Sequence, residues 1–304
     1  MAVEITRPGK NSLILDCPVM PAAGTFGFGD VYRGMVNLEK LGAIVTNPVT
    51  YKPWHPATGT RVIPLDAGVL VHTGLPNLGI SKTLATYRTA LDKLPLPIIL
   101  HVVATSPGDV ASCAARIDAE HAIDAIELGL NDDTSIDESV DFVRAAVRRT
   151  EKPVLVRLPL NEAYTLAQPV ADAGAGALVI AAPPRGTARD PYSGRLLSGR
   201  IYGPLVKPMV LRVVGQLADQ VDVPIIGAGG IHSPQDARDY LDAGAVAVQV
   251  DSATWIEPKM LEIIARDLGG LVITRAAGAF PDEWFPGMGE TARQRRQRGD
   301  EEEE

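Results

Sequence analysis

Two loops in the last third of the chain carry residue types that bind phosphate. Gly227–Gly230 directly follows the apolar, β-branched run Val223–Ile226. Asp251–Ala253 follows a second apolar run, Ala245–Val250. Glycines at the C-terminal end of a strand let backbone N–H groups approach an anion closely, and the second loop adds donors. In (β/α)8 barrels the phosphate site lies after strands 7 and 8, so the two loops predict such a site. The alternative is that these glycines only form tight turns, and phosphate binding alone would not identify an enzyme.

The composition excludes several classes of protein. The chain has 304 residues, of which 46% are hydrophobic and 22% charged, with a formal net charge of −8. The negative balance argues against a broad nucleic-acid surface, and no apolar run reaches the ~20 residues of a membrane-spanning helix. The first residues lack the apolar core of a signal peptide, and the only cysteines, Cys17 and Cys113, show neither metal-ligand nor disulfide spacing. We therefore expect a soluble, cytoplasmic protein that contacts no membrane and holds no metal ion.

Strands and helices alternate along most of the chain. Val3–Leu15 has the pattern of a hairpin that could plug the bottom of a barrel, and Pro48–Gly79 is too long for an ordinary loop, so we expect an insertion over the barrel mouth. Pro183–Gly203 is a second long loop. The expected strands are Pro18–Met20, Ala43–Thr46, Ile98–Val103, Ala125–Leu128, Val154–Leu158, Ala177–Ala181, Val223–Ile226 and Ala245–Val250. The expected helices are Val31–Leu41, Ile80–Leu94, Gly108–Glu120, Ile136–Arg149, Ala163–Ala173, Leu205–Gln220, one beginning at Ser233 and Pro234, and Pro258–Leu268.

About eight such units predict an α/β fold, a single (β/α)8 TIM barrel with an N-terminal hairpin and a long insertion after strand 2. A doubly wound sheet in two domains is the alternative. We expect the barrel to span residues 1–286. Residues 287–304 contain four arginines followed by an acidic run, and their composition predicts a disordered, charged tail.

Several stretches resemble the dihydroorotate dehydrogenase family when they are taken in order. They are Pro18–Gly29, Leu41–Thr46, Gly74–Gly79, Ile126–Leu128, Gly203–Pro208, Ile226–Ile231 and Gly244–Val250. Each stretch alone is weak, and their shared order carries the resemblance, which covers roughly residues 12 to 270. The family consists of FMN-dependent (β/α)8 barrels of pyrimidine metabolism. The resemblance therefore implies an oxidoreductase that acts on a CH–CH bond.

The resemblance also implies a set of site residues. Those implied for FMN are Ala22, Ala23, Gly24, Thr46, Asn47, Arg157, Gly203, Gly229, Gly230, Asp251 and Ser252. Asn77 and Asn131 are implied for substrate, and Asp132, His101 and Arg157 for catalysis. A base would take a proton while a hydride passes to the flavin. Because the chain has no iron–sulfur cysteine cluster, the electrons would leave to an unknown acceptor, for which a separate electron-transfer partner is one candidate. We also expect a homodimer.

This chain departs from the family's pattern at positions that contact cofactor or substrate. Asn47 replaces a lysine, Val71, His101 and Ala182 replace asparagines, Asp132 stands at the base position, Arg157 replaces a lysine, Tyr202 replaces a serine, and Asp251-Ser252 replaces Gly-Thr. Arg157 keeps a positive charge beside a reduced ring. Val71 and Ala182 remove groups that would pair with a polar pyrimidine, which argues for another substrate. Asp251 would face a phosphate dianion unless its side chain points away.

Three alternatives stay open at the level of sequence. Asp132 could act as a base or could, with its neighbours Asn131, Asp133 and Thr134, cap the next helix. His101 could contact the ring as a general acid or could be a structural histidine. The whole chain could be a non-catalytic relative that serves as a ligand-binding or assembly subunit, or a phosphate-binding lyase or isomerase, for which a strand-end lysine is missing.

Overall fold

A computed structural model describes residues 2–9 and 11–269, and within them eight parallel strands surround one core. The strands are β3 (Val19–Pro21), β4 (Ile44–Val45), β7 (Ile98–Val103), β8 (Ala125–Gly129), β9 (Val154–Pro159), β10 (Ala177–Ala182), β13 (Ile225–Ala228) and β14 (Ala247–Val250). They pair in the order β3-β14-β13-β10-β9-β8-β7-β4. The N–H of Gly42, before β4, donates to the carbonyl of Val19 in β3 at 2.8 Å and closes the ring. The predicted (β/α)8 barrel is confirmed.

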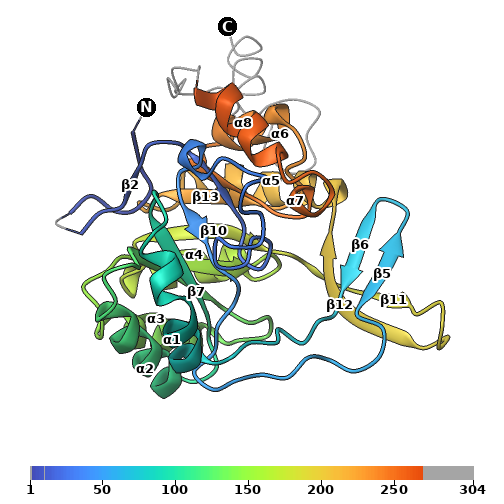
Figure 1. Ribbon diagram of the computed structural model, residues 1–304, viewed down its shortest axis with the longest axis horizontal. Helices are drawn as coiled ribbons and strands as arrows, with labels where there is room; N and C mark the ends of the chain where they lie inside the picture. Colours follow the sequence, from blue (N-terminus) through green and yellow to red (C-terminus); the bar gives the residue numbers. More distant parts are fainter. Residues whose placement is uncertain (1, 10, 270–304) are drawn as a thin grey trace, which may run out of the picture.

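Helices cover the outside of the strands (Figure 1). They are α1 (Ile80–Leu91), α2 (Pro107–Asp118), α3 (Ile136–Val147), α4 (Ala163–Asp172), α5 (Lys207–Leu217), α6 (Pro234–Asp242), the short α7 (Ala253–Ile256) and α8 (Met260–Gly269), with 3-10 turns η1 (Leu38–Lys40) and η2 (Pro204–Val206). None of the helices in the described part of the chain is long and apolar enough to cross a membrane.

One expected helix is wrong. Val31–Leu41 forms turns and only the 3-10 turn η1. Gly34 adopts a positive φ of 79°, and Asn37 is extended at φ −79° and ψ 102°. Both conformations interrupt an α-helix, and the apolar spacing that suggested one could not reveal them. The expected tail at residues 287–304 lies outside the described residues.

The N-terminal hairpin closes the bottom of the barrel, as predicted. Strands β1 (Val3–Glu4) and β2 (Ile14–Leu15) pair antiparallel, and the N–H of Arg7 donates to the carbonyl of Gly176, just before β10, at 2.7 Å. Apolar hairpin side chains pack against the inward residues of the strands. This lower layer consists of Ile5, Leu13, Leu15, Met20, Ala43, Val45, Ile99, Ala125, Leu155, Ala177, Val179, Ile226, Ala228 and Ala247.

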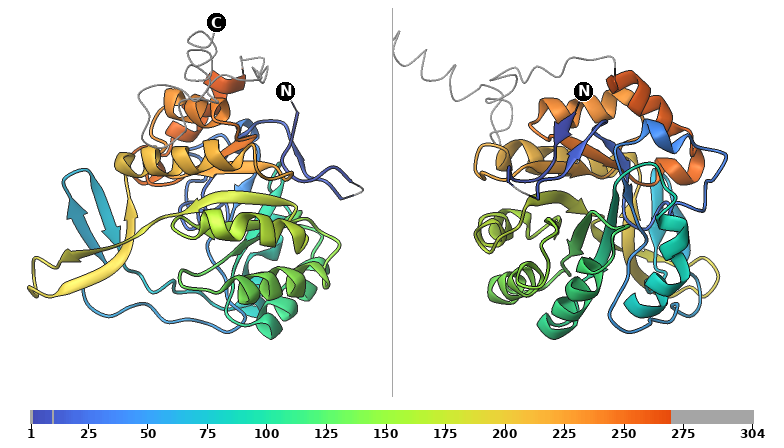
Figure 2. Two further views of the ribbon diagram at one scale, coloured as in Figure 1. Left: turned by 180° about the vertical axis from the view of Figure 1, so that it is seen from behind. Right: turned by 60° about the vertical axis from the view of Figure 1, so that its left-hand side comes forward.

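The two long insertions form a second sheet beside the barrel. Strands β5 (Val62–Leu65) and β6 (Gly68–Val71) come from the first insertion, and β11 (Arg185–Arg189) and β12 (Leu196–Tyr202) from the second. They pair antiparallel in the order β11-β12-β6-β5, and Figures 1 and 2 show the sheet extending to one side of the barrel. The short strands of the first insertion were expected, whereas the hairpin in Pro183–Gly203 and its pairing with β6 were not.

Candidate active site

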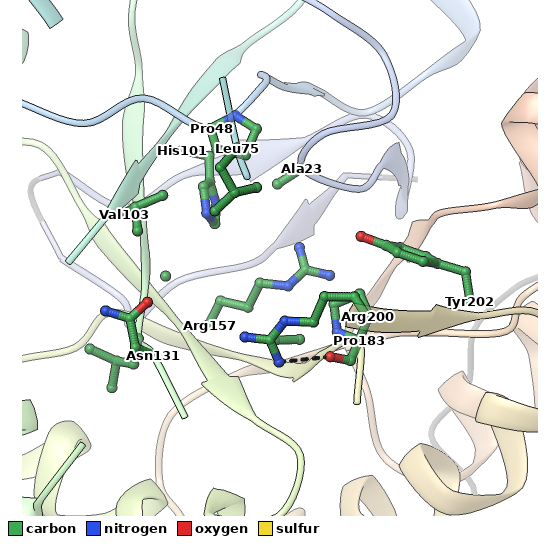
Figure 3. A pocket seen from close by; sticks show the side chains of 13 residues that line it. Ala23, Pro48, Leu75, His101, Val103, Asn131, Arg157, Pro183, Arg200 and Tyr202 are labelled. Atoms are coloured by element: carbon green, nitrogen blue, oxygen red, sulfur yellow. Dashed lines mark hydrogen bonds between the residues drawn. The ribbon is translucent and has the colours of Figure 1, made fainter. Parts of the chain in front are cut away.

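A pocket opens at the barrel mouth, where the carboxyl ends of the strands meet (Figure 3). It is a small cavity of about 100 Å³ that opens to solvent. Residues from several strand ends and from β12 form its wall. They are Ala23, Pro48, Leu75, His101, Val103, Gly129, Leu130, Asn131, Arg157, Ala182, Pro183, Arg200 and Tyr202.

A buried polar network lies directly below this pocket. The Glu127 carboxylate is fully buried and contacts His101 Nδ1 at 2.8 Å and Arg157 Nη1 at 3.1 Å. Gln249 donates its amide N–H to the other Glu127 oxygen and accepts from Arg157 at 2.9 Å. Arg157 also donates to the Ala181 carbonyl at 3.3 Å. Four strands, β7, β8, β9 and β14, thus contribute one side chain each to a single charged layer.

The network fixes the charge of Glu127. Burial raises the pKa of this carboxyl, but the charge of Arg157 and the hydrogen bonds from His101 and Gln249 outweigh burial and lower the pKa to about 2. Glu127 is therefore ionised at neutral pH and only accepts hydrogen bonds. It follows that His101 carries a proton on Nδ1, which leaves Nε2 as the nitrogen that reaches the pocket.

Glycine at position 129 makes room for His101. A Cβ on Gly129 would lie 2.7 Å from His101 Nε2 and 2.8 Å from Cε1, closer than carbon atoms can approach. From the other side, the His101 backbone N–H donates to Thr46 Oγ1 at 3.2 Å. The imidazole therefore packs closely over Gly129 of β8, with 8% of its side chain exposed.

The structure directs Asp132 towards an arginine. Arg200 Nη1 donates to Asp132 Oδ1 at 2.8 Å, and a second hydrogen bond joins Nη2 and Oδ2. Arg185 adds a longer contact of 3.8 Å. The capping interpretation is wrong, because Ser135 is the N-cap of α3 and its hydroxyl accepts from the Glu138 N–H. Asp132 instead links the loop after β8 to the second sheet, through Arg200 of β12.

The two residues expected to bind substrate lie in different surroundings. Asn131 lines the pocket and donates to the Ala104 carbonyl at 2.6 Å. Asn77 holds the insertion together, since its Oδ1 accepts from Thr50 Oγ1 at 3.0 Å and from the Gly79 N–H at 2.9 Å. The neighbouring Leu75 reaches the pocket wall in its place.

The glycines of the expected phosphate site come together. A Cβ on Gly230 would lie 3.0 Å from the Gly203 carbonyl oxygen and 2.5 Å from the Lys207 nitrogen, so the loops after β12 and β13 touch. The preceding residue, Gly229, is held by Tyr240, whose hydroxyl donates to the Gly229 carbonyl at 2.7 Å. From the loop after β14, Ser252 Oγ lies 3.1 Å from His232 Nε2. Three loops distant in sequence therefore share one small volume.

Comparisons with known proteins bear on the whole folded part of the chain. The family model for dihydroorotate dehydrogenase matches residues 11–272. The chain belongs to the dihydroorotate dehydrogenase family. This confirms the resemblance and the reading as a flavin-dependent oxidoreductase that acts on a CH–CH group, over the non-catalytic alternative.

Similar proteins in this family carry the name dihydroorotate dehydrogenase B (NAD(+)), catalytic subunit. The protein from Pelobacter propionicus is 34% identical over 83% of this chain and 88% of its own length. Those from Trichlorobacter lovleyi and Geobacter metallireducens are also 34% identical, over 88% and 83% of this chain and 92% and 88% of their own lengths.

The mouth of this dihydroorotate dehydrogenase-family barrel fits a flavin with one exception. Among the described residues, Asn47 Oδ1 and Arg157 Nε are buried without a hydrogen-bond partner, as expected of atoms that face a polar ring. Ala22, Ala23 and Gly24 form the turn after β3, where Gly24 takes a φ of 84°. The exception is Asp251, whose carboxylate accepts from the Ser252 N–H and thus uses a donor expected to bind phosphate.

Sequence reasoning missed three residues of the site. Glu127 and Gln249 were read only as parts of strands, and Arg200 as part of a long loop. Strand alternation could have found two of them, because residues two apart on a strand point to the same side. Glu127 lies two residues from Gly129, and Gln249 two residues from Asp251, so both should point into the barrel. A polar residue at an inward position of a barrel strand needs a partner, and that requirement points to the network.

Proposed function

We propose that this chain is an FMN-dependent dehydrogenase that acts on a CH–CH bond of a substrate other than dihydroorotate. The observation that supports it best is the buried Arg157 guanidinium at the floor of a pocket built from strand ends, in a family of flavin oxidoreductases. Bound FMN would supply a ring that accepts a hydride and then releases the electrons singly or in pairs.

Each end of the cofactor has residues to hold it. Arg157 offers a fixed positive charge and the unpaired Nε to the electron-rich edge of the ring, which favours the reduced, anionic form. Asn47 offers its unpaired Oδ1 to a ring N–H. The backbone of Gly203, Gly229, Gly230 and Ser252 would hold the phosphate, and the Ala22–Gly24 turn and Thr46 would contact the ribityl chain.

His101 is the better placed proton acceptor of the two candidates. Its Nε2 reaches the pocket while the ionised Glu127 holds Nδ1–H, an arrangement that orients the ring and stabilises the imidazolium once Nε2 takes a proton. Asp132 forms a two-point ion pair with Arg200, so it acts by positioning that arginine at the mouth.

Within the described residues, the pocket wall lacks groups that would pair with a pyrimidine ring. Ala182 lines the pocket where the family resemblance implies an asparagine, and Pro183 and Val103 extend the apolar surface. Each unpaired ring heteroatom would cost about 1–3 kcal/mol, and the missing lysine at Asn47 about 1.5–3 kcal/mol. Because ~1.4 kcal/mol is a factor of ten, dihydroorotate oxidation should be roughly 10³-fold slower than in a family member that keeps the lysine and asparagines.

Two measurements test the proposal. The visible spectrum of the purified protein, before and after addition of FMN and gel filtration, should show flavin bands near one equivalent. A colourless protein that stays colourless with added FMN would contradict it. Steady-state assays with dihydroorotate and several electron acceptors should give little turnover. An ordinary enzymatic rate would mean that the substituted residues still bind and oxidise a pyrimidine, and would contradict the proposed change of substrate.

We propose a separate electron-transfer partner, because the relatives are named as catalytic subunits and this chain's two cysteines cannot hold an iron–sulfur cluster. A homodimer and a cytoplasmic location are further proposals. Analytical ultracentrifugation of the purified chain would test the dimer.

A further inference from the structure

The loop after β14 carries a carboxylate at the place where the proposed function requires an anion to bind. Gln249 points into the barrel, since it contacts both Glu127 and Arg157. Side chains alternate along a strand, and Asp251 directly follows β14 two residues after Gln249, so it continues the inward positions of that strand. Its side chain is 2% exposed. Asp251 therefore does not point away from the mouth.

Asp251 uses donors that a phosphate would need. Its Oδ1 accepts from the Ser252 N–H at 2.5 Å and from Ser252 Oγ at 3.1 Å. The same Ser252 hydroxyl lies 3.1 Å from His232 Nε2, in the loop that begins with Gly229 and Gly230. Asp251 thus occupies the hydrogen-bond donors that the loop after β14 would contribute to the phosphate site.

We propose that Asp251 is an internal competitor for the phosphate group, so that FMN binds with uptake of a proton by Asp251. An ionised carboxylate and a phosphate dianion cannot share these donors without strong repulsion. A protonated Asp251 carries no charge and can itself donate a hydrogen bond to a phosphate oxygen. This inference rests on the proposed function, because it concerns the same cofactor site.

The surroundings of Asp251 make its protonation easier than in water. Burial raises the pKa of Asp251, while the Ser252 hydrogen bonds and the charges of His232 and Arg157 oppose this, and the pKa stays above its ordinary value. The other titratable groups that face it are Tyr202 and Tyr240, from β12 and α6. Both are phenols whose pKa is raised, so they stay neutral and do not add charge.

Titration with FMN and with riboflavin, which lacks the phosphate, tests the inference. Flavin fluorescence quenching should show that FMN affinity of the wild-type protein falls at least about tenfold between pH 5.5 and 8.5. In D251N it should change by less than about threefold, and at pH 8.5 D251N should bind FMN at least about tenfold more tightly than the wild type. Riboflavin affinity should differ little between the two proteins or across this range.

Calorimetry in two buffers of different ionisation enthalpy gives a second readout. Wild-type protein should take up close to one proton more than D251N when FMN binds at pH 8. D242N, which removes the same charge from an exposed residue of α6, is the matched control and should behave as wild type. Melting temperatures establish that each variant is folded.

The outcomes separate this inference from the proposed function. Equal FMN affinity and equal pH dependence in wild type and D251N would overturn the inference while FMN binding itself upheld the proposed function. A pH dependence that persists in D251N would come from another group, such as the phosphate itself with its second pKa of about 6, and would also overturn the inference. Failure of every folded variant to bind either flavin would overturn both.

Discussion

The two halves of the barrel interior are built from the same strands and have opposite chemistry. The lower layer is apolar and is closed by hairpin residues such as Ile5 and Leu15. The upper layer, one inward position further along each strand, holds His101, Glu127, Arg157 and Gln249. The lower layer needs only volume and apolar surface, whereas every group in the upper layer needs a partner. The lower layer therefore contributes to stability alone, whereas the upper layer contributes to both stability and chemistry.

The largest expected effect comes from breaking the upper layer at its centre. E127Q removes the charge that balances Arg157, and leaving a buried charge uncompensated costs about 3–5 kcal/mol of unfolding free energy. Urea unfolding should show this loss. E138Q, at an exposed residue of α3, should change stability by less than ~0.5 kcal/mol. A loss in E127Q no larger than in E138Q would mean that the network contributes little.

Breaking the lower layer should cost stability without changing chemistry. L155A leaves a cavity at a fully buried site and should destabilise the protein by about 2–5 kcal/mol. Its FMN retention, measured by absorbance after gel filtration, should match that of wild type at a temperature where both are folded. Specific loss of flavin would show that the two layers are coupled.

Of the two layers, only the upper one contains a carboxylate, so it should be the layer that is sensitive to acid. Because the pKa of Glu127 is lowered from its ordinary 4.5 to about 2, its stabilising contribution is fully present above pH 4.5 and is lost as the pH falls towards 2. A shift of this size corresponds to roughly 3 kcal/mol. Unfolding free energies of wild type and L155A should therefore decline in parallel between pH 5 and 2.5, whereas E127Q should decline less. Parallel behaviour of all three would assign acid sensitivity to other carboxylates.

A smaller effect is expected from displacing His101. G129A places a Cβ within 2.7 Å of the imidazole, which Glu127 prevents from moving freely, so the expected cost is about 1–3 kcal/mol. The imidazole NMR signals of His101 should shift. G108A, in α2 and with no atom within 4 Å of the added carbon, should be neutral or slightly stabilising. Unshifted His101 signals in G129A would mean that the ring has room to relax.

The sequence determined the barrel and the positions of most candidate residues. Alternation of apolar strands with amphipathic helices is a local property, so Ile98–Val103 was located to the residue. The glycines at 203, 229 and 230 were expected near one another, because loops after neighbouring parallel strands open on the same side of the barrel. Where local backbone conformation overruled the pattern, as at Gly34 and Asn37, the expected helix was wrong.

Only the tertiary structure decided what the individual side chains do. Asp132 had the chemistry of a base, but its role depends on Arg200, which lies 68 positions away and reaches it through the pairing of two insertions. Glu127 shows the same dependence, since its partners come from β7, β9 and β14. Local sequence fixes which face of a strand a side chain occupies. The charge, orientation and partners of that side chain are set by residues distant in the chain, because electrostatic and hydrogen-bond energies depend on distances in space.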